Sequence, residues 1–131
     1  ARLELVLDTY LSVGTPAQVA LAGLLASGRQ LGDRIRDRLR VNLEAARRIV
    51  AAAPSCTLLR AEGGWSVVVR VPAVTGEEAL VLGLLEEEGV LVHPGYFFDF
   101  PREAYLVVSL LPEQGDFETG LARVVSRAGI A

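Results

Sequence analysis

Residues 56–71 read CTLLRAEGGWSVVVRV, and this stretch decides the fold class. Its two apolar runs, 56–60 and 65–71, are separated by Ala-Glu-Gly-Gly, a glycine-rich connection that is typical of a β-hairpin. In a strand, every second residue lies on the same face. In the second run this places Trp65, Val67, Val69 and Val71 on one face, and Ser66, Val68 and Arg70 on the other. The stretch therefore predicts two antiparallel strands in the middle of the chain.

Upstream of the hairpin, the pattern is helical. A first helix is expected to begin at Thr15, with Thr15 and Gln18 as a capping box and Pro16 in the first turn, and to end at Ser27-Gly28. Its residues 19–26 are apolar nearly all round, so we expect this helix to be buried or to lie against a partner. A longer amphipathic helix is expected from about Leu31 to Ala53, before Pro54, with inward positions at Leu31, Ile35, Leu39, Leu43, Ala46, Val50 and Ala53.

Downstream of the hairpin, a helix is expected to be capped by Thr75 with Glu78 and ended by Gly89. Two strands, 90–93 and 105–111, follow it. A final helix from about Glu113 should turn one face inward, comprising Phe117, Leu121, Val124 and Ala128. The expected fold class is α+β: an antiparallel or mixed sheet of about four strands, covered by helices and preceded by a long interdomain helix.

Residues 1–14 have no clear domain-like pattern. Leu3–Leu7 alternates like a short strand, and residues 8–14 have no period. We interpret 1–14 as a connector from a preceding large domain and 15–131 as one small domain.

Composition excludes several classes of function. A net charge of −3 does not favour nucleic acid as a partner, and no apolar run reaches the roughly 18–20 residues of a membrane span. The single cysteine, Cys56, cannot form an internal disulfide, and with no signal-peptide pattern the chain is expected in the cytoplasm. The sequence contains no lysine. It therefore cannot form a lysine Schiff base, and no pattern of metal ligands is visible.

Three segments together resemble the class I/II aminotransferases of fold type I, which depend on pyridoxal 5'-phosphate. They are YLSVGTPAQ at 10–18, EGGW at 62–65, and GVLVHPGYFF at 89–98 followed by YLVVSL at 105–110. The resemblance covers nearly the whole chain, in order. It implies the C-terminal small domain of such an enzyme, which closes over the substrate and transfers an amino group between an amino acid and a 2-oxo acid. It also implies a cofactor lysine in the missing large domain, a homodimer, and a fragment that is inactive alone.

The same resemblance identifies a departure. The family places an arginine for the substrate carboxylate at the position that holds Val107 here. We expect Arg102, which leads into the same strand, to replace it, although Arg102 could instead be a surface arginine beside Glu103. Tyr96 and Phe97 are the other candidate substrate-binding residues. With Phe98 they could form a pocket wall, or pack in the core between the sheet and the last helix, which we favour for at least two of the three.

Other candidate groups have structural interpretations. His93 is expected to be a structural or surface residue, Cys56 a core residue, and Glu86–Glu88 a solvated helix end. A second hypothesis sets the resemblance aside: residues 56–131 could form a stand-alone regulatory module, ferredoxin-like or amino-acid-sensing, that binds a small ligand.

Overall fold

The computed structural model describes residues 2–9 and 13–130, and the chain divides into two compact units, residues 1–34 and 35–131. The first unit contains helices α1 (Arg2–Thr9) and α2 (Thr15–Ser27) and the start of α3 (Arg29–Ala51). The strand expected at Leu3–Leu7 is wrong, because these residues belong to α1. A helix pairs its backbone groups within itself, whereas a strand needs a neighbouring strand to do so.

The start of α2 differs from the expected capping box. Its N-cap is Gly14, without a side-chain capping bond, and Thr15 already lies inside the helix. Gln18 instead donates from Nε2 to the Val13 carbonyl over 2.7 Å. Helix α2 buries none of its residues against the described part of the chain, which leaves the alternative that it lies against a partner as a prediction.

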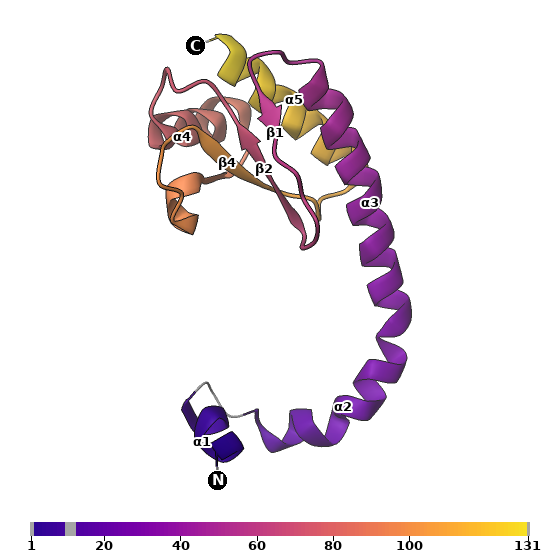
Figure 1. Ribbon diagram of the computed structural model, residues 1–131. Coiled ribbons are helices and arrows are strands. Elements are labelled where there is room, and N and C mark those ends of the chain that lie inside the picture. Colours follow the sequence, from indigo (N-terminus) through magenta and orange to yellow (C-terminus); the bar gives the residue numbers. More distant parts are fainter. Residues whose placement is uncertain (1, 10–12, 131) are drawn as a thin grey trace. The chain divides into compact units, whose positions relative to one another are not determined.

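The second unit contains the expected four-stranded antiparallel sheet (Figure 1). Its strands are β1 (Thr57–Leu58), β2 (Ser66–Arg70), β3 (His93–Pro94) and β4 (Tyr105–Ser109), in the order β1-β2-β4-β3. The expected hairpin pairs Thr57 with Arg70 and Leu58 with Val69. β3 is shorter than the expected strand 90–93 and includes Pro94, which an edge strand tolerates because one side of it needs no N–H partner.

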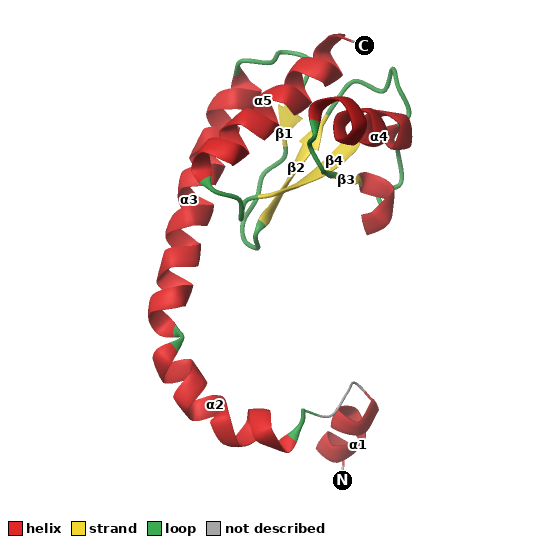
Figure 2. Cartoon of the chain, turned by 180° about the vertical axis from the view of Figure 1, so that it is seen from behind, coloured by secondary structure: helices red, strands yellow, loops and turns green. Residues whose placement is uncertain are grey.

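Helices α3, α4 (Glu77–Glu88) and α5 (Gln114–Ile130) contribute buried residues to one core with a single face of this sheet (Figure 2). The central sheet residues in the core are Val67 and Val69 of β2 and Leu106 and Val108 of β4. The inward positions expected for α5 are all buried, namely Phe117, Leu121, Val124 and Ala128. Cys56 is buried as expected, but Trp65 is exposed because it precedes β2 at the hairpin turn.

The long helix α3 is buried only in its second half. Ala46 and Val50 lie in the core, whereas Leu31 and Ile35, which were expected to face inward, are exposed. The sequence pattern missed Asn42, which is fully buried and donates from Nδ2 to the carbonyls of Leu110 and Pro112, at 2.9 Å each. These bonds join α3 to the segment between β4 and α5.

The expected cap of α4 at Thr75 is wrong by one residue, since the N-cap is Gly76, without a side-chain capping bond. It ends as expected at Gly89, whose left-handed conformation (φ 66°) suits a residue without Cβ. No described helix is long and apolar enough to cross a membrane.

Candidate functional site

The sheet has an outer face, opposite the helices, and Val107 lies in the middle of it. Val107 pairs with Val68 on β2 and with His93 on β3. Because side chains alternate along a strand, Val107 points away from the core that holds Leu106 and Val108. It is nevertheless only 6% exposed. An aliphatic side chain therefore fills the position at which the resemblance placed a carboxylate-binding arginine.

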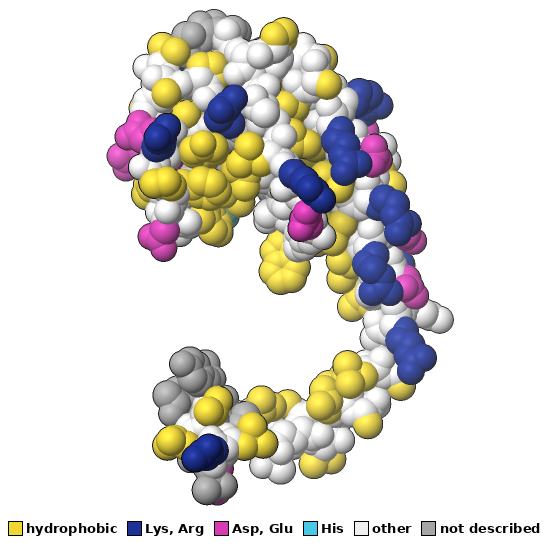
Figure 3. All heavy atoms as spheres, in the orientation of Figure 1, with side chains coloured by type: hydrophobic (Ala, Val, Ile, Leu, Met, Phe, Trp, Pro, Cys, Tyr) yellow, Lys and Arg dark blue, Asp and Glu magenta, His cyan; other side chains and the backbone are white. Residues whose placement is uncertain are grey.

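Beside this face, the one-turn 3₁₀ helix η1 (Gly95–Phe98) presents three aromatic rings. Tyr96, Phe97 and Phe98 are 48%, 63% and 52% exposed, so the core packing favoured for at least two of them is wrong. Their segment follows edge strand β3, and the inward side of α5 is already filled by the sheet and its own helical neighbours. Figure 3 shows hydrophobic side chains gathered at η1, the orange helical turn of Figure 1.

The rings contact one another and His93. The centroids of Tyr96 and Phe97 are 4.9 Å apart with their planes at 89°, an edge-to-face pair. His93 lies 6.1 Å from Phe97 and 6.2 Å from Phe98. His93 is exposed, as expected of a surface histidine. The structure thus brings two of the predicted site residues, Tyr96 and Phe97, into direct contact.

The third predicted site residue, Arg102, lies in the loop between η1 and β4. It is exposed, and no hydrogen bond or ion pair joins it to another described residue. The loop has two residues with positive φ, Asp99 at 56° and Ala104 at 84°, a conformation that is uncommon outside glycine. Arg102 therefore lies exposed in the loop before β4, five positions before Val107.

A buried carboxylate that the sequence did not reveal holds this region together. Glu77, at the start of α4, is 2% exposed. Its Oε1 accepts the N–H of Tyr105 at 2.7 Å, and its Oε2 accepts the N–H of Tyr96 at 3.2 Å. The sequence does not show which residue of the pair Glu77-Glu78 is buried, because the N–H groups that bind Glu77 come from distant segments.

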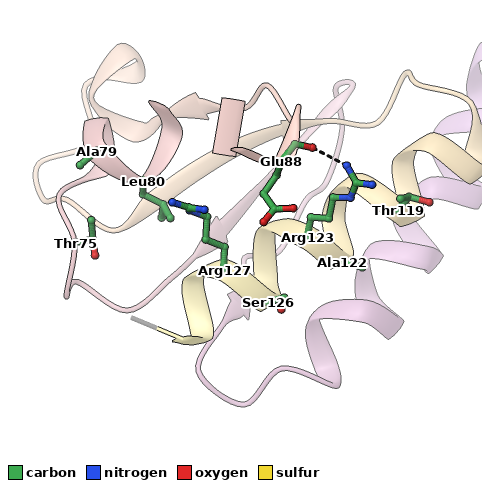
Figure 4. Close-up of a pocket in the computed structure, with 9 residues that line it drawn as sticks. All are labelled: Thr75, Ala79, Leu80, Glu88, Thr119, Ala122, Arg123, Ser126 and Arg127. Atoms are coloured by element: carbon green, nitrogen blue, oxygen red, sulfur yellow. Dashed lines mark hydrogen bonds between the residues drawn. The ribbon is translucent and has the colours of Figure 1, made fainter. Parts of the chain in front are cut away.

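A separate hollow of about 830 Å³ lies between α4 and α5 (Figure 4). Its two cations already have partners. Arg127 binds Glu87 through two hydrogen bonds of 2.8 Å, and Arg123 donates to the Glu88 carbonyl over 2.6 Å. The Arg127 hydrogen bonds and charge lower the pKa of Glu87. The solvated helix end expected at Glu86–Glu88 thus includes an ion pair to α5, whereas the partner of Arg123 is a neutral carbonyl.

The described residues include no cluster of side chains that could hold a metal ion. They also fit pyridoxal 5'-phosphate poorly as a covalent ligand, since the sequence has no lysine to form the Schiff base.

No protein-family model and no curated protein matches the sequence. Solved structures do match it. A pyridoxal-phosphate-dependent aminotransferase from Streptococcus suis is 24% identical with a TM-score of 0.76, over 92% of this chain and 32% of that one. An aminotransferase from Escherichia coli with a methionine aminotransferase function matches with 22% identity and a TM-score of 0.67, over 88% and 31%. The α-aminoadipate aminotransferase LysN from Thermus thermophilus matches with 23% identity and a TM-score of 0.67, over 85% and 30%.

These matches confirm the α+β fold and its likeness to a domain of pyridoxal-phosphate-dependent aminotransferases. The chain spans about a third of the length of each of the three. Part of the resembling segment, residues 10–12, lies outside the described residues.

Proposed function

We propose that this chain is the C-terminal small domain of a pyridoxal-phosphate-dependent aminotransferase and that it forms the substrate side of the active site. One observation carries the proposal: 92% of the chain shares its fold with the Streptococcus suis aminotransferase. The three resembling segments occur in the same order along the chain, which adds support from the sequence. A shared fold alone does not establish activity, so the proposal needs a direct test.

In this proposal the cofactor belongs to a large domain that precedes the connector at residues 1–14 in the functional protein. The lack of lysine supports this division, because a residue outside this chain must form the Schiff base. The cofactor provides the amino-transfer chemistry, and the protein provides binding and orientation. We further propose that the functional protein is a homodimer, which sedimentation velocity of the full-length protein would test.

The outer face of the sheet is the proposed substrate side. Tyr96 and Phe97 provide exposed aromatic surface beside it, whereas Val107 is buried within it. We propose that Arg102 binds the substrate carboxylate in place of an arginine at position 107. Its support is that it is exposed, that it bonds to no other described group, and that its loop leads directly into β4. A guanidinium fork matches a carboxylate with two parallel hydrogen bonds.

The first experiment compares this chain with the full-length protein encoded by its gene. With pyridoxal phosphate added, the chain alone should show no lysine aldimine absorbance and no transamination. The full-length protein should show the aldimine band and should convert it when an amino acid is added. A full-length protein without a cofactor-binding lysine, or without amino-acid-dependent conversion, would disprove the proposed function.

The second experiment tests Arg102 within the full-length protein. Removing a charged hydrogen-bond partner of a carboxylate costs about 1.5–3 kcal/mol, so Arg102→Ala should raise KM for the amino acid by roughly 10- to 150-fold. Arg47→Ala is the matched control, since Arg47 is an exposed arginine on α3, the helix that packs on the opposite face of the sheet. An equal effect of both variants, or no effect of Arg102→Ala, would exclude Arg102 as the carboxylate ligand.

A further inference from the structure

The carboxylate of Glu77 joins three parts of the chain that are distant in sequence. Glu77 is the first residue of α4, Tyr96 belongs to η1, and Tyr105 begins β4. The backbone N–H groups of both tyrosines donate to the two oxygens of this one carboxylate. A buried charge is costly unless it is hydrogen-bonded, and here both oxygens have a partner.

Two features of the surroundings of Glu77 favour a carboxylate at this position over an amide. It lies in the first turn of α4, where the positive end of the helix dipole stabilises negative charge. A glutamine would have the same shape, but its NH₂ group would face one of the two N–H donors. Only one of the two bonds could then remain.

The segment at η1 is fitted closely to this carboxylate. Gly95 begins η1 and is buried, and a Cβ there would lie 2.9 Å from the Tyr105 Cβ and 3.2 Å from Glu77 Oε1. Only a residue without a side chain allows the backbone of η1 to approach this closely. The aromatic rings of Tyr96 and Phe97 themselves are exposed and have no core packing to hold them.

We infer that Glu77 is a positioning residue, which fixes the backbone of η1 against β4 and so sets where Tyr96 and Phe97 lie. The substrate-binding consequence rests on the proposed function: if these rings line the substrate site, Glu77 acts on the substrate through them and does not touch it.

The first test uses this chain and amide hydrogen exchange followed by NMR. In Glu77→Gln, the amide of Tyr96 or of Tyr105, whichever then faces the NH₂ group, should exchange faster, by about tenfold or more, because a lost bond to a charged group is worth about 1.5–3 kcal/mol. Glu78→Gln is the matched control, since Glu78 is the exposed neighbour on the same helix and loses the same charge. Unchanged exchange at both tyrosines in Glu77→Gln would overturn the inference.

A second variant guards against a general loss of folding. Gly95→Ala leaves Glu77 in place but pushes η1 away from it, so it should accelerate exchange at Tyr96 while amides in the distant β1–β2 pair keep their protection. Acceleration spread evenly over all amides in both variants would mean that Glu77 supports the whole fold and does not position η1.

The substrate consequence is tested in the full-length protein. Glu77→Gln should raise KM for the amino acid by about threefold to tenfold with kcat nearly unchanged, because it displaces binding groups without removing a reacting one. Glu78→Gln should change neither. Normal KM in Glu77→Gln, despite faster amide exchange, would overturn the substrate role. If the full-length protein shows no transamination at all, the proposed function fails, and amide exchange still decides the positioning role.

Discussion

Helices α2 and α5 are both rich in apolar residues, but only α5 buries them. In α2, Val19, Leu24 and Leu25 are 81%, 58% and 64% exposed. In α5, Phe117, Leu121 and Val124 are at most 3% exposed because they pack on the sheet. The apolar residues of α5 are restricted to one side, whereas α2 is apolar nearly all round. The difference shows that an apolar helix sequence favours burial, but that the side chains are buried only where another surface packs against them.

The largest expected effect compares one leucine from each helix. Leu121→Ala should lower the free energy of unfolding by about 2–5 kcal/mol, because it removes buried methyl groups and leaves a cavity. Leu25→Ala should change it by less than about 0.5 kcal/mol, because its side chain is exposed. Urea denaturation of both variants, followed by circular dichroism at equal concentration, measures this. Similar losses for both would mean that α2 packs against an apolar surface in solution.

A second comparison uses a polar residue that is buried. Asn42→Ala should lower the free energy of unfolding by about 1–3 kcal/mol, because the carbonyls of Leu110 and Pro112 lose their donor. Val41→Ala is the control one position away, since Val41 is exposed. Urea denaturation again gives the values. A larger loss of unfolding free energy in Val41→Ala than in Asn42→Ala would contradict the prediction that the buried amide matters more than the exposed apolar side chain.

The ends of α2 and α4 provide a third comparison. Both end in glycine, but Gly28 is right-handed (φ −74°) and Gly89 is left-handed (φ 66°). Gly89→Ala should cost about 1 kcal/mol, because an L-residue is strained in that conformation, although nothing lies within 4 Å of the added Cβ. Gly63→Ala is the control, with equally open space and no positive φ. Thermal denaturation should show a lower Tm for Gly89→Ala alone.

The smallest expected effect concerns the ion pair that joins α4 to α5. Because Arg127 lowers the pKa of Glu87 in the folded chain, the pair contributes stability above the ordinary pKa of 4.5. That contribution is lost as pH falls through the lowered pKa. Stability measured by urea denaturation between pH 6 and pH 3 should therefore fall less steeply in Glu87→Gln than in the unchanged chain. Equal slopes would show that the pair contributes nothing in solution.

The hairpin and α5 could be predicted from the sequence because their signals are local. Period-two alternation around Glu62-Gly63-Gly64 predicted β2, and the helical spacing of Phe117 and Leu121 predicted the buried side of α5. Gly89 was recognised as a helix end for the same reason. The prediction of a strand at Leu3–Leu7 was wrong, because an alternating pattern of only five residues is also compatible with a short helix.

The candidate site was predicted only in part. Tyr96, Phe97 and Arg102 were identified through the resemblance, and their substrate role stays a prediction. The exposure of the Tyr96 and Phe97 rings was not predicted. Aromatic residues usually pack in a core, and the sequence does not show which surfaces other side chains already cover. Glu77 was missed entirely, since its donors lie 19 and 28 residues away.

The sequence by itself determined the order of helices α2 to α5 and strands β1 to β4, the antiparallel hairpin, the absence of a Schiff-base lysine and the valine at position 107. These follow from residue identity and short-range periodicity. Only the tertiary structure decided that Asn42 and Glu77 are buried, that the rings of η1 are exposed, and that Arg102 has no described partner. Burial and hydrogen bonding depend on which distant segments come into contact in the fold, and a local sequence pattern does not predict those contacts.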